Sequence, residues 1–185
     1  MRRVVLYQLL SLDGVAEEPG DWMFEAGPEI FDNLAAVIER QDTVLLGRGT
    51  YDYWCDYWPT SDVQPFADFI NGTEKHVVTS TPLTGSWQNS TAVHTDAADH
   101  VRSLAAQDGG DIGIHGSIGL AQSLLAAGLV DELQLVVVPT VAGHGRRLLE
   151  PGSPTRRLAL VRSERSSSGD LLITYVFRPD DSTPS

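Results

Sequence analysis

The sequence predicts an α/β fold with a mainly parallel sheet and an antiparallel hairpin near the C-terminal end. Over most of the chain, strand-like apolar segments alternate with segments whose apolar residues recur at helical spacing, as in parallel α/β sheets. The last two strand-like segments, 157–162 and 171–178, are joined by a flexible serine-rich turn without a helix between them. They therefore predict an antiparallel hairpin. In total, about eight strands are expected.

The chain opens with a strand and a long polar loop. Residues 4–10 are almost continuously apolar, which predicts a strand buried on both faces. The loop that follows runs to about Gly27, and loops of this length are uncommon unless they are functional. Pro28 begins a predicted helix over 28–40. The next expected elements are a buried strand at 43–46, a short aromatic helix after Thr50, a helix at 64–70, and strands at 76–79 and 91–93.

The second half of the chain continues the alternation. A helix is predicted from Asp96 to about residue 106, where Gly109-Gly110 stops it. It is followed by a strand at 111–115, a helix at 118–127 and a strand at 132–138. Without a repeat or an interdomain linker, residues 1–179 are expected to form one domain. The polar, proline-containing residues 180–185 predict a disordered tail.

Composition restricts the possible partners. The formal net charge of -12 argues against nucleic acid, whose binding requires lysine and arginine at the phosphates. No apolar run approaches the ~20 residues that span a bilayer, and the single cysteine, Cys55, suits a reducing compartment, so a cytoplasmic protein is expected. Six arginines crowd between Arg146 and Arg165. They fit either a solvated hairpin or a patch that attracts an anionic substrate.

Two glycine-containing turns are candidate phosphate sites. The strand at 43–46 runs into Gly47-Arg48-Gly49-Thr50, and the strand at 111–115 runs into a second turn at 115–119. At such strand-to-helix turns, free backbone N–H groups and the helix dipole favour a phosphate, and glycine allows close approach. A third segment, Thr79-Ser80-Thr81, ends a strand with hydroxyl groups that suit a ribose or its 2′-phosphate. Ligands in open α/β sheets bind at such carboxyl ends.

These segments, in this order, resemble the dihydrofolate-reductase-like superfamily, and in particular the branch that contains the reductase domain of riboflavin biosynthesis and its stand-alone relatives. The resemblance covers nearly the whole chain. It is carried by residues 11–14, 46–51, 77–81, 115–117, 128–133, 138–139 and 143–145. It implies a three-layer α/β/α fold, an NADPH cofactor, a small-molecule substrate and a homodimer.

The resemblance also implies the residues of the site. The cofactor would contact Gly14, Gly47, Arg48, Gly49, Thr50, Thr79, Ser80, Thr81, Ile114, Gly116, Ser117, Ile118 and Gly119. Within this set, Gly47, Arg48 and Thr50 would take the pyrophosphate, and the hydroxyl run would hold the adenosine end. His115 replaces one of two glycines that are usual in the family, where the following peptide bond is cis. Trp22, Phe31 and Trp54 are candidate substrate-binding residues, although tryptophans here also suit a dimer interface.

The catalytic acid departs from the family pattern. The helix position where dihydrofolate reductases keep their acid corresponds to Phe31, and the adjacent Asp32 faces about 100° away. Asp13, at the end of the first strand, is the other candidate. The expected substrate is therefore a small heteroaromatic or ribosylaminopyrimidine-type compound, as in the 5-amino-6-(5-phosphoribosylamino)uracil reductases. A dihydrofolate-reductase-type pteridine reductase is an alternative.

Two further classes remain open at this stage. A non-catalytic dinucleotide-binding protein would keep the phosphate turns and lack a substrate acid. A serine hydrolase is suggested by Ser117, Asp131 and His144, which follow the hydrolase order, although the interval from Ser117 to His144 is short for a catalytic triad. No metal site is expected, because the five histidines lack the paired spacing of metal ligands.

Overall fold

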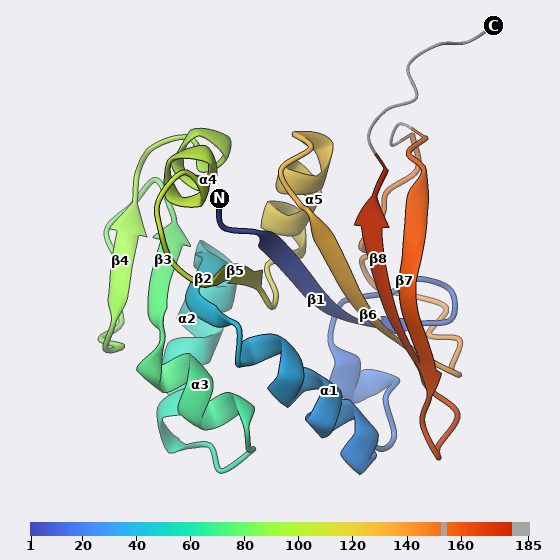
Figure 1. Cartoon of the computed structure of the whole chain (residues 1–185). Coiled ribbons are helices and arrows are strands. Elements are labelled where there is room, and N and C mark those ends of the chain that lie inside the picture. The colour runs from blue at the N-terminus through green and yellow to red at the C-terminus, as the bar shows by residue number, and fades with distance from the viewer. Residues whose placement is uncertain (153–154, 179–185) are drawn as a thin grey trace, which may run out of the picture.

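The computed structural model describes residues 1–152 and 155–178, in which eight strands form one sheet of order β4-β3-β2-β5-β1-β6-β8-β7 (Figure 1). The strands are β1 (Val4–Ser11), β2 (Gln41–Gly47), β3 (Glu74–Val78), β4 (Ser90–Val93), β5 (Asp111–Ile114), β6 (Glu132–Val138), β7 (Leu158–Arg165) and β8 (Leu171–Phe177). The helices are α1 (Pro28–Ile38), α2 (Arg48–Tyr57), α3 (Phe66–Gly72), α4 (Ala97–Ala105) and α5 (Ile118–Ala126), with 3-10 turns η1 (Pro19–Asp21) and η2 (Trp58–Thr60). The predicted tail at 180–185 and the predicted domain end at residue 179 lie outside the described residues.

Strand pairing confirms the predicted fold class. The strands from β4 across to β6 all run parallel to their neighbours. β8 then pairs antiparallel with β6, and β7 pairs antiparallel with β8, so the last two strands are the expected hairpin. None of the described helices is long and apolar enough to cross a membrane.

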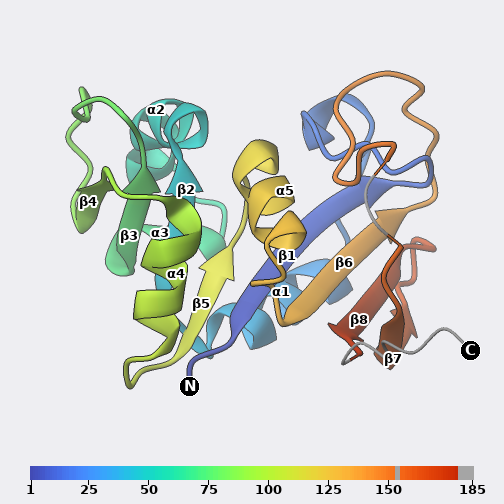
Figure 2. The same ribbon diagram turned by 90° about the horizontal axis from the view of Figure 1, so that it is seen from above.

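Helices cover both faces of the sheet, which gives the three layers (Figures 1 and 2). On one face, Leu104 of α4 and Leu124 of α5 pack against Leu6 of β1. On the other face, Ile30 and Val37 of α1 pack against Val5 and Val136, and α3 adds Phe66 and Ile70 beside β2. Each helix therefore presents its apolar stripe to the sheet, as its 3.6-residue spacing requires.

The short central strand β5 creates an opening in the sheet. Its last residue, Ile114, lies opposite Leu6 of β1 and Leu45 of β2. Beyond Leu6, β1 continues from Tyr7 to Ser11, paired with β6 and with no described strand on its other side, and β2 continues to Gly47. The carboxyl ends of β1 and β2 thus border a gap above β5. Open α/β sheets bind their ligands in crevices of this kind.

Candidate active site

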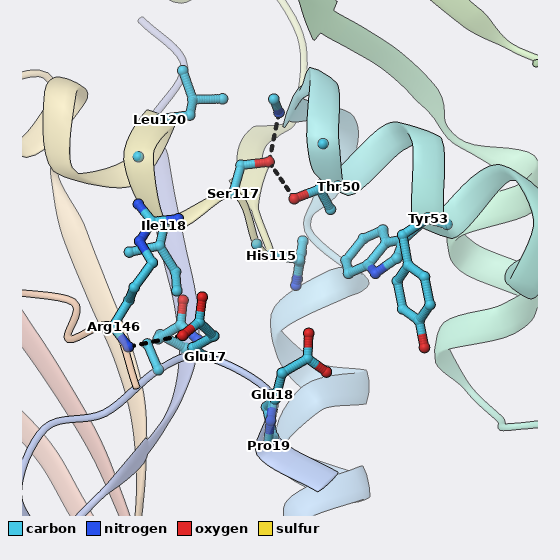
Figure 3. Close-up of a pocket in the computed structure, with 17 residues that line it drawn as sticks. Glu17, Glu18, Pro19, Thr50, Tyr53, His115, Ser117, Ile118, Leu120 and Arg146 are labelled. Atoms are coloured by element: carbon cyan, nitrogen blue, oxygen red, sulfur yellow. Dashed lines mark hydrogen bonds between the residues drawn. The ribbon is translucent and has the colours of Figure 1, made fainter. Parts of the chain in front are cut away.

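The two glycine turns meet at this edge of the sheet. The Ser117 hydroxyl accepts a hydrogen bond of 2.6 Å from the Gly47 amide and donates one of 2.6 Å to Thr50 Oγ1 (Figure 3). Ser117 stands directly before α5 with φ 64°, a left-handed conformation that turns its side chain toward α2. The N-termini of α2 and α5 are therefore held side by side by one hydroxyl group.

A cavity of about 510 Å³ lies in front of these two helix ends. We call it the larger cavity. Eight of the residues singled out in the sequence line it: Gly47, Gly49, Thr50, Trp54, Gly116, Ser117, Ile118 and Gly119. A Cβ atom added to Gly49 would have no atom within 4 Å, so this stretch of backbone is open to a ligand. The donor groups fit a dinucleotide pyrophosphate, because both helix ends present free N–H groups and positive dipole ends.

The opposite wall comes from the long loop after β1. It brings Glu17, Glu18 and Pro19 to the larger cavity, where the carboxylates of Glu17 and Glu18 lie across from Ser117 (Figure 3). The Arg146 amide donates to Glu17 Oε2 at 3.0 Å, which fixes the loop against residues 139–152. The length of the loop signalled a functional role, but nothing in the sequence distinguished these two carboxylates from solvated ones.

Arg146 is the basic residue of the larger cavity. A Cβ atom placed on Gly119 would lie 3.6 Å from Arg146 Nη2, so the guanidinium reaches the first turn of α5. It adds positive charge where the helix dipole already favours an anion. The crowding of arginines between 146 and 165 was the sequence signal for this residue. Gln8 of β1 and Tyr53 of α2 also line the cavity without having been singled out.

Arg48 reaches the hydroxyl-rich segment after β3. Its Nη1 donates to Thr81 Oγ1 at 2.7 Å and to the Pro82 carbonyl at 2.8 Å, and its Nε lies 2.7 Å from Asp52 Oδ1. Thr79 Oγ1 donates to the Thr81 carbonyl at 2.9 Å. The structure thus brings Arg48 together with Thr79 and Thr81, while Ser80 and Thr81 are exposed. None of these residues lines the larger cavity itself.

Asp13 is bound by the end of β1 and by the segment after β6. Its carboxylate accepts hydrogen bonds from the Ser11 hydroxyl at 2.7 Å and from the backbone amides of Ala142 and Gly143 at 2.9 and 3.0 Å. These donors, led by the Ser11 hydroxyl and the Ala142 amide, lower its pKa to about 2. The ionised carboxylate joins the β1 loop to residues 139–152.

Other candidates divide between the core and the surface. Trp22 is buried in the cluster around β1 and donates its indole N–H to the Glu17 carbonyl at 2.8 Å. Asp32 is exposed on α1. Gly14 has φ 82° and closes the turn after β1, and Ile114 packs into the core beneath α5. None of these four is among the described residues that line a cavity at the opening above β5.

A second cavity of about 270 Å³ adjoins the first. We call it the aromatic cavity, because Tyr7, Phe31, Trp54, Trp58 and Phe66 line it together with Leu9, Leu34 and Val63. It shares four lining residues with the larger cavity: Gln8, Pro19, Trp54 and His115. The two cavities therefore form one cleft, with helix N-termini at one end and aromatic rings at the other. Phe31 and Trp54, two of the three predicted substrate residues, face its aromatic end.

His115 sits where the two cavities join. Its ring packs against Tyr7, Phe66 and Phe69, with centroids 5.8, 5.2 and 5.7 Å away. Its Nε2 lies 2.6 Å from Gln41 Oε1. Burial lowers the pKa of His115 to about 3, so the imidazole is neutral. The cis peptide bond of the described residues is Gln64-Pro65, and the bond from His115 to Gly116 is trans.

With this cleft defined, comparisons with known proteins identify the family. The model of the RibD C-terminal domain matches residues 2–172. The chain belongs to this family. Two uncharacterised proteins of Bacillus subtilis (strain 168) are similar to it: YwjB is 31% identical over 147 residues, covering 78% of this chain and 80% of YwjB, and YyaP is 26% identical over 181 residues, covering 94% of each.

Solved structures confirm the dihydrofolate-reductase-like fold. A putative riboflavin biosynthesis protein from Shewanella sp. PV-4 matches with a TM-score of 0.78 and 19% identity, over 96% of this chain and 99% of that one. Dihydrofolate reductase from Enterococcus faecalis, complexed with NADP(H), matches with a TM-score of 0.63 and 16% identity, over 96% and 97%. The deaminase/5-amino-6-(5-phosphoribosylamino)uracil reductase of Thermotoga maritima matches at 0.69 and 16%, over 96% of this chain and 57% of that one. The family and the fold together support a reductase of the riboflavin-pathway type.

Proposed function

We propose that this chain is an NADPH-dependent reductase whose substrate is a small heteroaromatic or ribosylaminopyrimidine-type compound. The observation that carries the proposal is the Ser117 hydroxyl, which holds two helix N-termini at one end of a cleft whose other end is aromatic. Helix ends suit a pyrophosphate, and aromatic walls suit a flat ring. A dinucleotide and a ring-shaped substrate bound in this cleft would meet near His115.

In this proposal the chain's own residues bind and orient the two ligands. The N-termini of α2 and α5 with Arg146 would hold the pyrophosphate, and Arg48 with Thr81 would bind the 2′-phosphate. A bound nicotinamide would supply a hydride, which together with one proton would reduce a C=N bond of the substrate to CH–NH. Glu17 and Glu18 are the carboxylates that line the cleft, and we propose them, in place of Asp13 and Asp32, as the groups that bring this proton.

Coenzyme titration tests the proposal directly. Trp54 lines both cavities, so NADPH binding should quench tryptophan fluorescence. NADH and NADPH are titrated in parallel, and pteridine, pyrimidine and riboflavin-precursor substrates are then offered while absorbance of the reduced nicotinamide is followed. Absence of binding for both dinucleotides contradicts the proposal.

Arg48 should determine the preference for NADPH. Arg48→Ala removes the cation that we place beside the 2′-phosphate, and a charge-assisted contact of this kind is worth ~1.5–3 kcal/mol. NADPH affinity should fall at least tenfold, and NADH affinity should change less than threefold. Arg102→Ala is the matched control, because Arg102 forms a similar intrahelical ion pair with Asp99 on the exposed side of α4. Equal losses for the two coenzymes would place Arg48 elsewhere.

The contacts of Ser117 argue against the hydrolase alternative. Among the described residues its hydroxyl bonds to Gly47 and Thr50, and Asp131 accepts the Val4 amide at 2.8 Å. A nucleophilic serine needs a histidine within hydrogen-bonding reach. Labelling by a fluorophosphonate at Ser117 would reverse this conclusion.

We also propose that the protein is a cytoplasmic homodimer. The strand β7 is one edge of the sheet, and it exposes Leu160 and Val161. A second copy can pair with such an edge antiparallel around a two-fold axis, which satisfies free backbone groups on both strands. The half-buried, unpaired Cys55 supports a reducing compartment. Fractionation of the producing cell tests the location.

A further inference from the structure

The charge of the side chains that line the aromatic cavity restricts the substrate more closely than the fold alone does. None of the eleven described residues that line it is an arginine, lysine, aspartate or glutamate. Its titratable side chains are His115, which is neutral near pH 7, and Tyr7, whose pKa burial raises. The substrate end of the cleft therefore offers no counter-charge to an anion.

The positive groups of the cleft lie at its other end. Arg146 and the first turns of α2 and α5 border the larger cavity, where the proposed function places the cofactor phosphates. The carboxylates of Glu17 and Glu18 line the same cavity, across from Ser117 (Figure 3). A substrate phosphate at the aromatic end would lose hydration without gaining an ion pair, in a chain whose net charge is -12. Sites for phosphorylated substrates normally supply arginine or lysine.

The walls of the aromatic cavity match a flat ring. Trp54, Trp58 and Phe66 form a triangle with centroids 5.8, 4.8 and 5.6 Å apart, each pair packed edge to face. Phe31 and Leu34 of α1 close another side. The volume of about 270 Å³ is below the ~300–1,000 Å³ of pockets for drug-sized ligands. One ring or two fused rings would fill it.

Polar atoms without partners also occur on four of the lining side chains. In the described part of the chain Tyr7 Oη, Gln8 Oε1, Trp58 Nε1 and His115 Nδ1 are buried and have no hydrogen-bond partner. Buried polar groups are nearly always paired, and unpaired ones call for a missing partner. Tyr7 and Trp58 supply N–H or O–H donors, and Gln8 Oε1 supplies an acceptor. The lining side chains therefore offer both donors and acceptors to a ring that carries both, such as a lactam-type heterocycle.

Resting on the proposed function, we propose that the substrate of this chain is an uncharged mono- or bicyclic heteroaromatic compound that carries no phosphate. The chain would thereby differ in substrate class from a reductase of phosphoribosylaminopyrimidines while sharing its fold. The reducible C=N bond belongs to the ring itself, and the hydrogen-bonding edge of the ring lies toward Tyr7 and Gln8.

The test compares ligands that differ by a phosphate. Binding of lumazine, of 5-amino-6-(5-phosphoribosylamino)uracil and of its dephosphorylated riboside is measured by tryptophan quenching, with and without saturating NADPH. We expect lumazine to bind and the phosphorylated pyrimidine to bind at least tenfold more weakly than its riboside. Tighter binding of the phosphorylated form than of its riboside overturns the inference, and so does failure of lumazine to bind.

An added charge gives an independent test. Val63 is exposed at the rim of the aromatic cavity, so Val63→Lys introduces an ammonium group there, and Val63→Gln is a neutral control of similar length. Val63→Lys should strengthen binding of the phosphorylated pyrimidine at least fivefold relative to Val63→Gln and leave lumazine unchanged. No gain would mean that the phosphate lies elsewhere, contrary to the inference. NADPH titration measures binding in the larger cavity separately. If NADPH does not bind while the protein still prefers lumazine to the phosphorylated pyrimidine, the proposed function is refuted and the inference about substrate charge is not.

Discussion

The Ser117 hydroxyl joins two segments that are 70 residues apart in the chain. Ser117→Ala leaves the Gly47 amide and Thr50 hydroxyl without this partner, at a cost of ~1 kcal/mol in the free energy of unfolding. Because the two helix ends then separate, NADPH affinity should fall by more than this loss of stability explains. Urea unfolding and NADPH titration measure the two effects. Ser123→Ala is the control, since Ser123 donates to the Leu120 carbonyl within the same helix.

His115 and Asp13 should each lower the free energy of unfolding as pH falls, and they should do so in different pH ranges. Both have pKa values below their usual ones, about 3 against 6.5 for His115 and about 2 against 3.8 for Asp13. The unfolded chain therefore binds more protons than the folded one as pH falls, and both groups make the protein less stable in acid. The loss attributable to His115 begins below pH 6.5, and that of Asp13 begins only near pH 4.

His115→Gln should accordingly flatten the loss of stability between pH 6.5 and 4. One proton of difference corresponds to a slope of up to about 1.4 kcal/mol per pH unit. Asp13→Asn should alter the slope of the free energy of unfolding against pH only below about pH 4. Urea unfolding at half-unit pH intervals gives both slopes, and His144→Gln controls for removal of an exposed histidine. An unchanged slope above pH 4 in His115→Gln would mean that this imidazole is charged in the fold.

At the scale of elements, the turn from β2 into α2 contains two glycines with different surroundings. A Cβ atom on Gly47 would lie 2.9 Å from Ser117 Oγ and 3.0 Å from Ser117 Cβ, whereas one on Gly49 would meet nothing within 4 Å. Gly47→Ala should therefore destabilise the fold by ~1–3 kcal/mol through overpacking. Gly49→Ala should leave stability unchanged or raise it by up to ~1 kcal/mol, since alanine favours a helix.

Cofactor binding should separate these two variants in a second way. Gly49 lines the larger cavity, so a methyl group there would stand between the α2 amides and a phosphate. Gly49→Ala is expected to weaken NADPH binding at least tenfold without lowering the free energy of unfolding. If it binds NADPH like the unmodified protein, the pyrophosphate does not approach this turn.

The elements themselves were predictable because their signals are local. Helical periodicity after Pro28 and the glycine turns after two strands predicted α1, α2 and α5 to within a few residues. The gap above β5 was not predictable, because it depends on strand order and on β5 ending opposite Leu6. Glu17 and Glu18 were missed because a carboxylate in a polar loop has no distinguishing local pattern. Trp22 was predicted to bind substrate, whereas in the structure this aromatic residue of the same loop covers the core.

At the scale of the whole molecule, the exposed edge of the sheet leads to a prediction about assembly. Leu160 and Val161 on β7 are 56% and 62% exposed, and β7 pairs with β8 alone among the described strands. Val161→Lys should prevent a second copy from pairing with this edge, because a charge at an exposed edge opposes strand addition. Light scattering should then give the monomer mass of 20.1 kDa for the variant and about twice this mass for the unmodified protein.

A control variant separates edge pairing from a general effect of added charge. Val141→Lys places the same charge on a residue that is 67% exposed in the segment between β6 and β7. It should leave the mass of the dimer unchanged. NADPH binding should persist in both variants, because the cleft above β5 is built by β1, β2 and β5 with α2 and α5, away from the edge strand. A dimer that survives Val161→Lys would show that the two copies meet through another surface.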